Sequence, residues 1–192
     1  MFEWTLGGVR CRISLLFPAL LAVLLTVQPD GLAVTCLLAA VLHEGGHLLA
    51  MLCLGYPPTA CTLSAFGVRL ELSGERLPGY VHNWLISFAG PAANGLAALC
   101  LWMLNRPQAA MVHVVLACFN LLPAGALDGG QMARCLLCLH GGERQAERWL
   151  PVFSAVVLLP LAVFSFYLFL SGQGNGTLAV VSVYLVLLLF FS

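Results

Sequence analysis

Long apolar segments constrain this chain more than any other feature of its sequence. A membrane-spanning helix needs about 20 mainly apolar residues, and the sequence has a succession of segments near that length. They cover approximately residues 13–27, 31–54, 82–104, 108–124, 150–170 and 177–191. The first and fourth are short for a full span. The pattern predicts an all-α polytopic membrane protein with about six transmembrane helices.

The composition points the same way. Of the 192 residues, 61% are hydrophobic and only 8% are charged, whereas a soluble domain has about 25% charged residues. So few charges cannot cover a water-exposed surface, so we expect the lipid bilayer to surround much of the chain. The formal net charge is zero, lysine is absent, and the eight arginines form no long basic run. A nucleic-acid partner is therefore not expected.

The arginines predict an orientation in the membrane. If both termini are cytoplasmic, seven arginines fall inside and only Arg106 falls outside. The seven are Arg10, Arg12, Arg69, Arg76, Arg134, Arg144 and Arg148. This bias satisfies the positive-inside rule, and the reverse orientation violates it. We expect a multi-pass protein of a bacterial plasma membrane with both termini in the cytoplasm.

A short β element is predicted between the second and third spans. Within residues 62–73, apolar residues at positions 68, 70 and 72 alternate with Arg69, Glu71 and Ser73. This period of two is typical of a strand. A proline pair at 57–58 precedes the segment, and Ser73 begins a turn signal after it. We expect one or two short strands at the cytoplasmic membrane surface.

Small residues and cysteines within the spans indicate close packing. Residues 89–95 read Ala-Gly-Pro-Ala-Ala-Asn-Gly, and small residues allow membrane helices to approach each other closely. Cys135 and Cys138 have CxxC spacing, but one such pair cannot complete a four-ligand zinc site. We therefore expect a tight helix crossing at 89–95 and packing roles for these two cysteines.

The second apolar segment contains ionisable side chains, which are costly at membrane depth and usually functional. They are His43, Glu44 and His47, in an HExxH pattern. Histidines four apart are offset by about 40° around a helix and by about 6 Å along it, so both rings point to one place. Two imidazoles on one face suit zinc. Glu44, turned about 100° from His43, can act on water there without being a ligand. The alternative is a pair of core histidines hydrogen-bonded to a buried glutamate.

A catalytic zinc ion usually has three protein ligands, so a third ligand is required. Of the two aspartates, Asp30 is next to a proline in a turn, and Asp128 follows the fourth apolar segment. Asp128 could also be the N-cap of a helix over 129–140. His82 and His113 compete with it for the third position. The residues alone leave these alternatives open.

Three segments together carry a resemblance to a known family. They are His43-Glu-Gly-Gly-His47, Gly90-Pro-Ala-Ala-Asn94 and Asn120-Leu-Leu-Pro-Ala-Gly-Ala-Leu-Asp-Gly129. In order and spacing they resemble the HExxH and NxxPxxxLDG motifs of the site-2 protease family of intramembrane zinc metalloproteases. The resemblance covers roughly residues 35–135. The compact layout is most similar to the sporulation-type members, which process a pro-sigma factor. We expect a single integral-membrane domain over 1–192, without PDZ or CBS domains.

The resemblance implies roles for individual residues. Asp128 would be the third ligand of one zinc ion per chain, and Glu44 the general base. Asn120 would position the substrate or polarise its carbonyl group. The implied activity is hydrolysis of peptide bonds in membrane-associated or transmembrane substrates, including a pro-sigma or anti-sigma factor. A regulatory membrane protein is a further expected partner.

A membrane helix hides its peptide bonds in internal hydrogen bonds, so a substrate must unwind before it is cut. The strand near 66–72 could pair with such an extended substrate, although a surface strand without this role is the alternative. Gly45 and Gly46 could let the third-ligand segment approach the metal closely.

Two other functions compete with proteolysis. A membrane metal transporter could use the same ligands as a transit site, but the outer halves of the spans have few polar groups to line a path. A catalytically silent relative could bind helices without cutting them, but the intact Glu44 argues against this interpretation.

Overall fold

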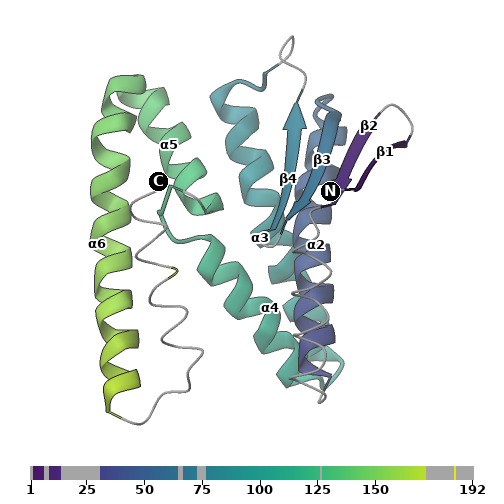
Figure 1. The fold of residues 1–192 in the computed structure, drawn as a ribbon, viewed down its shortest axis with the longest axis vertical. Helices are drawn as coiled ribbons and strands as arrows, with labels where there is room; N and C mark the ends of the chain where they lie inside the picture. The colour runs from purple at the N-terminus through teal and green to yellow at the C-terminus, as the bar shows by residue number, and fades with distance from the viewer. Residues whose placement is uncertain are drawn as a thin grey trace. The chain divides into compact units, whose positions relative to one another are not determined.

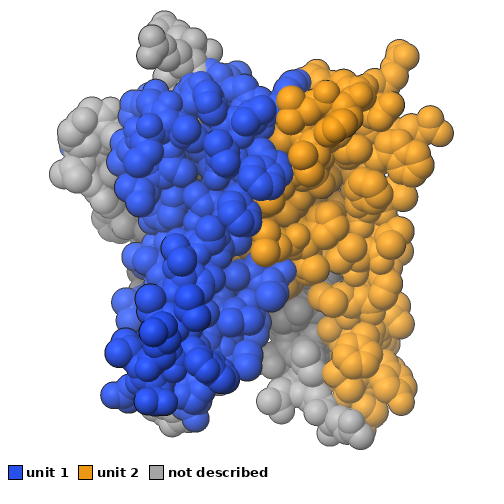
Figure 2. All heavy atoms as spheres, turned by 180° about the vertical axis from the view of Figure 1, so that it is seen from behind, with its two compact units in different colours: residues 1–118 blue, residues 119–192 orange. Residues whose placement is uncertain are grey.

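The structure is a computed structural model that describes residues 2–6, 9–13, 31–64, 67–72, 77–125, 127–171 and 184. The chain divides into two compact units, residues 1–118 and 119–192, which are coloured separately in Figure 2. The spans expected at 13–27 and 177–191 lie almost entirely outside the described residues.

Unit 1 combines strands and helices, whereas the described part of unit 2 is helical (Figure 1). The elements in chain order are β1 (Phe2–Leu6), β2 (Val9–Ile13), α2 (Leu32–Cys53), β3 (Pro58–Ser64), β4 (Gly67–Leu72), α3 (Tyr80–Met103), α4 (Pro107–Asn120), α5 (Asp128–Gly141) and α6 (Glu143–Leu170). The boundary between the units falls within the last turn of α4.

Among the described residues, three helices are long and apolar enough to cross a membrane, namely α2, α3 and α6. They confirm the helices expected at 31–54, 82–104 and 150–170, although α6 begins earlier, at Glu143. The helix expected at 108–124 is shorter, because α4 has 14 residues. At 1.5 Å per residue it extends about 21 Å, less than the roughly 30 Å of a hydrocarbon core.

Many large apolar side chains of these helices face outward. Leu49 on α2 is 63% exposed, Leu96 on α3 is 66% exposed and Val163 on α6 is 67% exposed. In water such surfaces would drive aggregation, whereas lipid chains cover them without cost. The long apolar helices with apolar outer faces fit a multi-pass membrane protein.

The strands of the described part of the chain form one four-stranded sheet in the order β1-β2-β3-β4. β1 and β2 are antiparallel, β2 and β3 are parallel, and β3 and β4 are antiparallel. The expected β element between the second and third spans is thus confirmed as two strands. The all-α fold class is wrong in this respect, because β1 and β2 add a hairpin at the N-terminus. Ile13, assigned to the first span, is the last residue of β2.

Helices α2 and α3 pack tightly against each other within unit 1. A Cβ atom on Gly46 would lie 2.6 Å from the carbonyl oxygen of Ala89 and 3.0 Å from the Cβ of Ala93. The small residues at 89–95 therefore make the close helix crossing that their sequence predicts. The segment that approaches Gly46 closely is therefore α3, whereas the sequence analysis considered a close approach by the third-ligand segment. A Cβ on Gly45 would meet no atom of the described residues within 4 Å.

Unit 2 has a small apolar core of its own. Its buried members are Ala124, Leu127, Leu158 and Ala162, with Phe119 and Leu122 packed against them. Cys135 and Cys138 of α5 are also buried, which agrees with the packing role expected for them. The Oγ atom of Ser154 ties the loop before α5 to α6, because it accepts a hydrogen bond of 3.0 Å from the backbone N–H of Gly125.

Candidate metal centre

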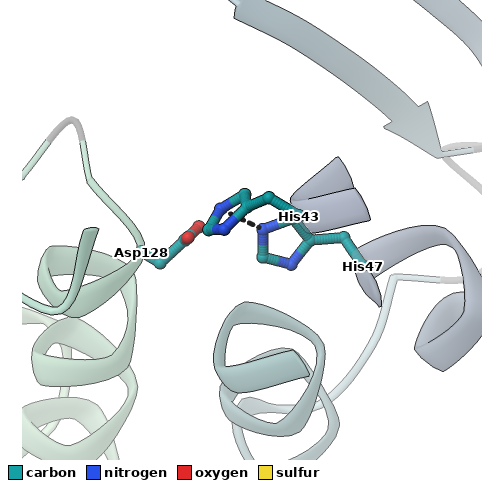
Figure 3. A group of neighbouring side chains, drawn as sticks. All are labelled: His43, His47 and Asp128. Carbon is teal, nitrogen blue, oxygen red and sulfur yellow. Dashed lines mark hydrogen bonds between the residues drawn. The ribbon is translucent and has the colours of Figure 1, made fainter. Parts of the chain in front are cut away.

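His43 and His47 meet on one face of α2, as the HExxH spacing predicts. Their Nε2 atoms lie 3.2 Å apart, the contact marked by the dashed line in Figure 3. Two nitrogen atoms bound to one tetrahedral zinc ion at about 2.0–2.1 Å are separated by about 3.3 Å. The observed separation therefore fits two ligands of a single zinc ion.

The orientation of His47 is fixed by the backbone of α3. Its Nδ1 atom lies 2.7 Å from the carbonyl oxygen of Ile86. A carbonyl oxygen can only accept, so Nδ1–H is the donor. In the neutral ring, Nε2 then carries the lone pair that a metal ion requires. This arrangement, in which the ligand's second nitrogen donates to a carbonyl, is typical of metal-binding histidines.

The orientation of His43 is fixed by a side chain instead. Its Nδ1 atom lies 3.1 Å from Nδ2 of Asn94, which is completely buried on α3. The other end of this amide, Oδ1, lies 2.9 Å from Nδ1 of His113 on α4. His43, Asn94 and His113 thus form one buried hydrogen-bonded chain within unit 1.

The two histidines that competed as third ligands are engaged elsewhere. His113 is buried and faces Asn94. His82 is exposed at the start of α3, and its Nδ1 lies 3.0 Å from the hydroxyl of Tyr56. Each imidazole therefore has a polar partner other than His43 and His47.

Gly90 lets α3 approach the two imidazole rings. A Cβ atom there would lie 2.6 Å from Cε1 of His47 and 2.9 Å from Nε2 of His43. Sequence reasoning assigned Gly90 and Asn94 to a helix crossing and to one of the segments that carry the family resemblance, but it missed their contacts with the histidines. The available signal was Asn94 itself, a polar residue in the middle of an apolar span.

Glu44 follows His43 on α2 and is half-buried. Its position one residue further along the helix directs its carboxylate about 100° away from the His43 ring. It can therefore reach the edge of the site without taking the place of either imidazole.

Asp128, the third residue drawn in Figure 3, is the first residue of α5 in unit 2. The N-cap of α5 is Leu127, so the interpretation of Asp128 as a helix N-cap is wrong. The backbone after Asp128 is closely packed, because a Cβ on Gly129 would lie 2.5 Å from the carbonyl oxygen of Leu122. Asn120, the last residue of α4, is half-buried.

Comparison with known proteins adds a curated relative, although no protein-family model matches the chain. A Mycobacterium tuberculosis protein, named "Putative zinc metalloprotease Rip3" in strains H37Rv and Erdman, is 30% identical over 159 residues. The match covers 74% of this chain and 39% of the relative. The chain thus spans about two fifths of the length of the curated relative.

Among solved structures, the site-2 protease from Methanocaldococcus jannaschii is similar with a TM-score of 0.70 and 19% sequence identity. The superposition covers 98% of this chain and 94% of that chain. The two proteins therefore share a fold over nearly their whole lengths. The chain is thus similar in sequence to the Mycobacterium protein and in fold to a site-2 protease.

Proposed function

We propose that this protein is an intramembrane zinc endopeptidase that hydrolyses peptide bonds of membrane-associated or transmembrane substrates. The observation that carries the proposal is the 3.2 Å separation of the His43 and His47 Nε2 atoms. It occurs on α2, a helix of membrane-spanning length, in a chain with the fold of a site-2 protease.

His43, His47 and Asp128 are the proposed ligands of one zinc ion per chain. They supply two imidazole nitrogens and one carboxylate, a donor set of the kind found in catalytic zinc sites. The tight packing around Gly129 supports a ligand role for Asp128, since it leaves the preceding backbone little freedom. A bound zinc ion polarises the scissile carbonyl and lowers the pKa of a coordinated water to about 7.

Glu44 is the proposed general base. Its carboxylate takes a proton from the attacking water and delivers it to the departing amine, which the collapse of the tetrahedral adduct requires. Asn120 is the proposed partner of the substrate carbonyl, to which its side-chain N–H groups can donate a hydrogen bond. The half-buried state of both residues is compatible with contact to a bound substrate.

An extended substrate can be held by β4. The strand order β1-β2-β3-β4 leaves the outer edge of β4 without a strand partner among the described residues. Main-chain pairing along such an edge keeps a substrate extended, and an extended peptide bond is open to attack. β4 also ends shortly before α3, the helix that packs against both histidines.

The proposed location is a bacterial plasma membrane, with both termini in the cytoplasm. The seven-to-one distribution of arginines supports this orientation. A cysteine placed at position 76 in an otherwise cysteine-free variant should then escape a membrane-impermeant label added from outside. A cytoplasmic site suits substrates that control transcription, such as a pro-sigma or anti-sigma factor. A membrane protein is the proposed regulator of the cleavage.

The decisive experiment combines zinc analysis with a cleavage assay. Purified protein is incubated with a panel of single-span substrates, with and without a chelator, and its zinc content is measured. We expect one zinc per chain, and cleavage that stops with chelator and returns with added zinc. Zinc flux across proteoliposomes without cleavage would indicate a transporter, and substrate binding without cleavage would indicate a silent relative.

A further inference from the structure

The loop before α5 is anchored at Gly125, whose two backbone polar groups both bond to side chains of unit 2. The N–H of Gly125 donates to the Oγ atom of Ser154 on α6 over 3.0 Å. Its carbonyl oxygen accepts a hydrogen bond of 3.2 Å from Nε2 of Gln131 on α5. A loop lacks the regular bonds of a helix or a strand, so each of its buried backbone groups needs another partner. Ser154 and Gln131 supply these partners at Gly125.

Ser154 lies on the face of α6 that packs against the apolar core of unit 2. Leu158 and Ala162 of that core follow it at intervals of four residues, which places all three on one side of the helix. Ser154 is only 1% exposed, and a buried hydroxyl group costs free energy unless it is hydrogen-bonded. Besides accepting from Gly125, this hydroxyl donates to the carbonyl oxygen of Leu150 over 2.9 Å. It therefore connects the loop to the backbone of α6.

The first turn of α5 packs against the same loop residue. A Cβ atom on Gly130 would lie 2.8 Å from Cα of Gly125, and it would also collide with the carbonyl group of Ala124. A side chain at position 130 would therefore push the loop away from α5. Gly125 is thus in contact with α5 through both its carbonyl oxygen and its Cα atom.

Asp128 is the first residue of α5, and only two residues separate it from Gly125. A displacement of Gly125 would be passed to the backbone of Asp128 over this short distance along the chain. The contacts that fix Gly125 therefore also limit where the carboxylate of Asp128 can lie.

We propose that Ser154 and Gln131 are positioning residues of the third zinc ligand. By fixing Gly125, they keep the backbone of Asp128 in the place from which its carboxylate can bind the metal. The inference rests on the proposed role of Asp128 in zinc binding. If the loop occupies this place only part of the time, the apparent zinc affinity falls in proportion to that fraction. Neither side chain has to touch the metal for this effect.

Substitutions on one face of α6 separate positioning from packing. Ser154→Ala removes the acceptor of the Gly125 N–H, whereas Ser154→Thr keeps a hydroxyl group. Ser165→Ala is the matched control, because Ser165 is also buried on this face and is not a hydrogen-bond partner of Gly125 in the described structure. A hydroxyl that only fills space predicts equal effects of the two alanine substitutions, since each removes one oxygen atom.

Zinc affinity, measured by chelator competition, should follow the contacts of Gly125. We expect weaker binding in Ser154→Ala, and wild-type binding in Ser154→Thr and Ser165→Ala. Gln131→Met removes the second contact at nearly constant side-chain length. Ser154→Ala combined with Gln131→Met leaves both backbone groups of Gly125 without partners, which is costly for buried groups. This double variant should bind zinc at least about tenfold more weakly than wild type, which corresponds to about 1.4 kcal/mol.

Amide hydrogen exchange gives a readout that depends on neither zinc nor catalysis. In metal-free protein in detergent, the N–H of Gly125 should exchange faster in Ser154→Ala than in wild type, and at the wild-type rate in Ser165→Ala. Unchanged exchange in Ser154→Ala would overturn the inference, as would wild-type zinc affinity in the double variant. A wild-type protein that binds no zinc would instead overturn the proposed function, so the two failures are distinguishable.

Discussion

Gly90 on α3 lies against the ring of His47 on α2, so closely that a Cβ atom there would be 2.6 Å from Cε1 of that ring. The same Cβ would be 2.9 Å from Nε2 of His43. We therefore expect Gly90→Ala to force both imidazoles out of position, at a cost of about 1–3 kcal/mol for overpacking. Chelator competition should show zinc affinity reduced by at least about tenfold, since 1.4 kcal/mol corresponds to a factor of ten.

Gly95→Ala on the same helix is the matched control. A Cβ at this position meets no atom of the described part of the chain within 4 Å. The control should bind zinc like wild type and gain up to about 1 kcal/mol of helix stability. Equal zinc affinity in both variants would show that Gly90 does not shape the site.

The adjacent glycines of α2 should respond oppositely to alanine. Gly46→Ala places a methyl group 2.6 Å from the carbonyl oxygen of Ala89, so we expect a loss of about 2 kcal/mol in the free energy of unfolding. Gly45→Ala, which points into open space within the described structure, should be neutral or stabilising by up to about 1 kcal/mol. Denaturant titration in detergent measures both. Similar unfolding midpoints would contradict the close packing of α2 on α3.

Glu44→Gln tests the general base. It retains the size of the side chain and both histidines, so the protein should fold, bind zinc and bind substrate. Cleavage should fall by about 10²–10⁴-fold, measured with a single-span substrate. Loss of zinc in this variant would indicate that Glu44 is a zinc ligand. Cleavage at the wild-type rate would show that Glu44 is not the general base.

Asp128→Ala tests the third ligand, and Asp30→Ala is its control because these are the two aspartates of the chain. Zinc analysis of the purified proteins should give a marked loss for the first and one zinc per chain for the second. Full zinc occupancy in Asp128→Ala would remove that residue from the ligand set.

The long helices were predictable because each depends on a local pattern. Runs of apolar residues defined α2, α3 and α6 to within a few residues, apart from the polar first turns of α6. The N-terminal hairpin was missed although its strands alternate polar and apolar residues around Gly7-Gly8. Arg10 and Arg12 were interpreted as charges flanking a span, whereas Arg12 pairs with Glu3 across the hairpin at 3.0 Å.

The metal centre was predictable only as far as spacing within a helix determines it. A spacing of four positions on one helix brings His43 and His47 together, independently of the surrounding structure. Gly90 and Asn94 contribute through the packing of α3 against α2, a long-range contact that no local pattern encodes. The family motif suggested a role for Asp128 that charge and hydropathy alone left open.

The orientations of His43 and His47 differ in their sensitivity to mutation, because one ring is held by a side chain and the other by the backbone. The anchor of His47 is the backbone carbonyl of Ile86, and every amino acid placed at position 86 would still supply that oxygen. The anchor of His43 is the side chain of Asn94, which most replacements would remove. Random mutagenesis should therefore find position 86 permissive and position 94 intolerant, although both residues are buried on the same helix and each contacts one of the two proposed histidine ligands.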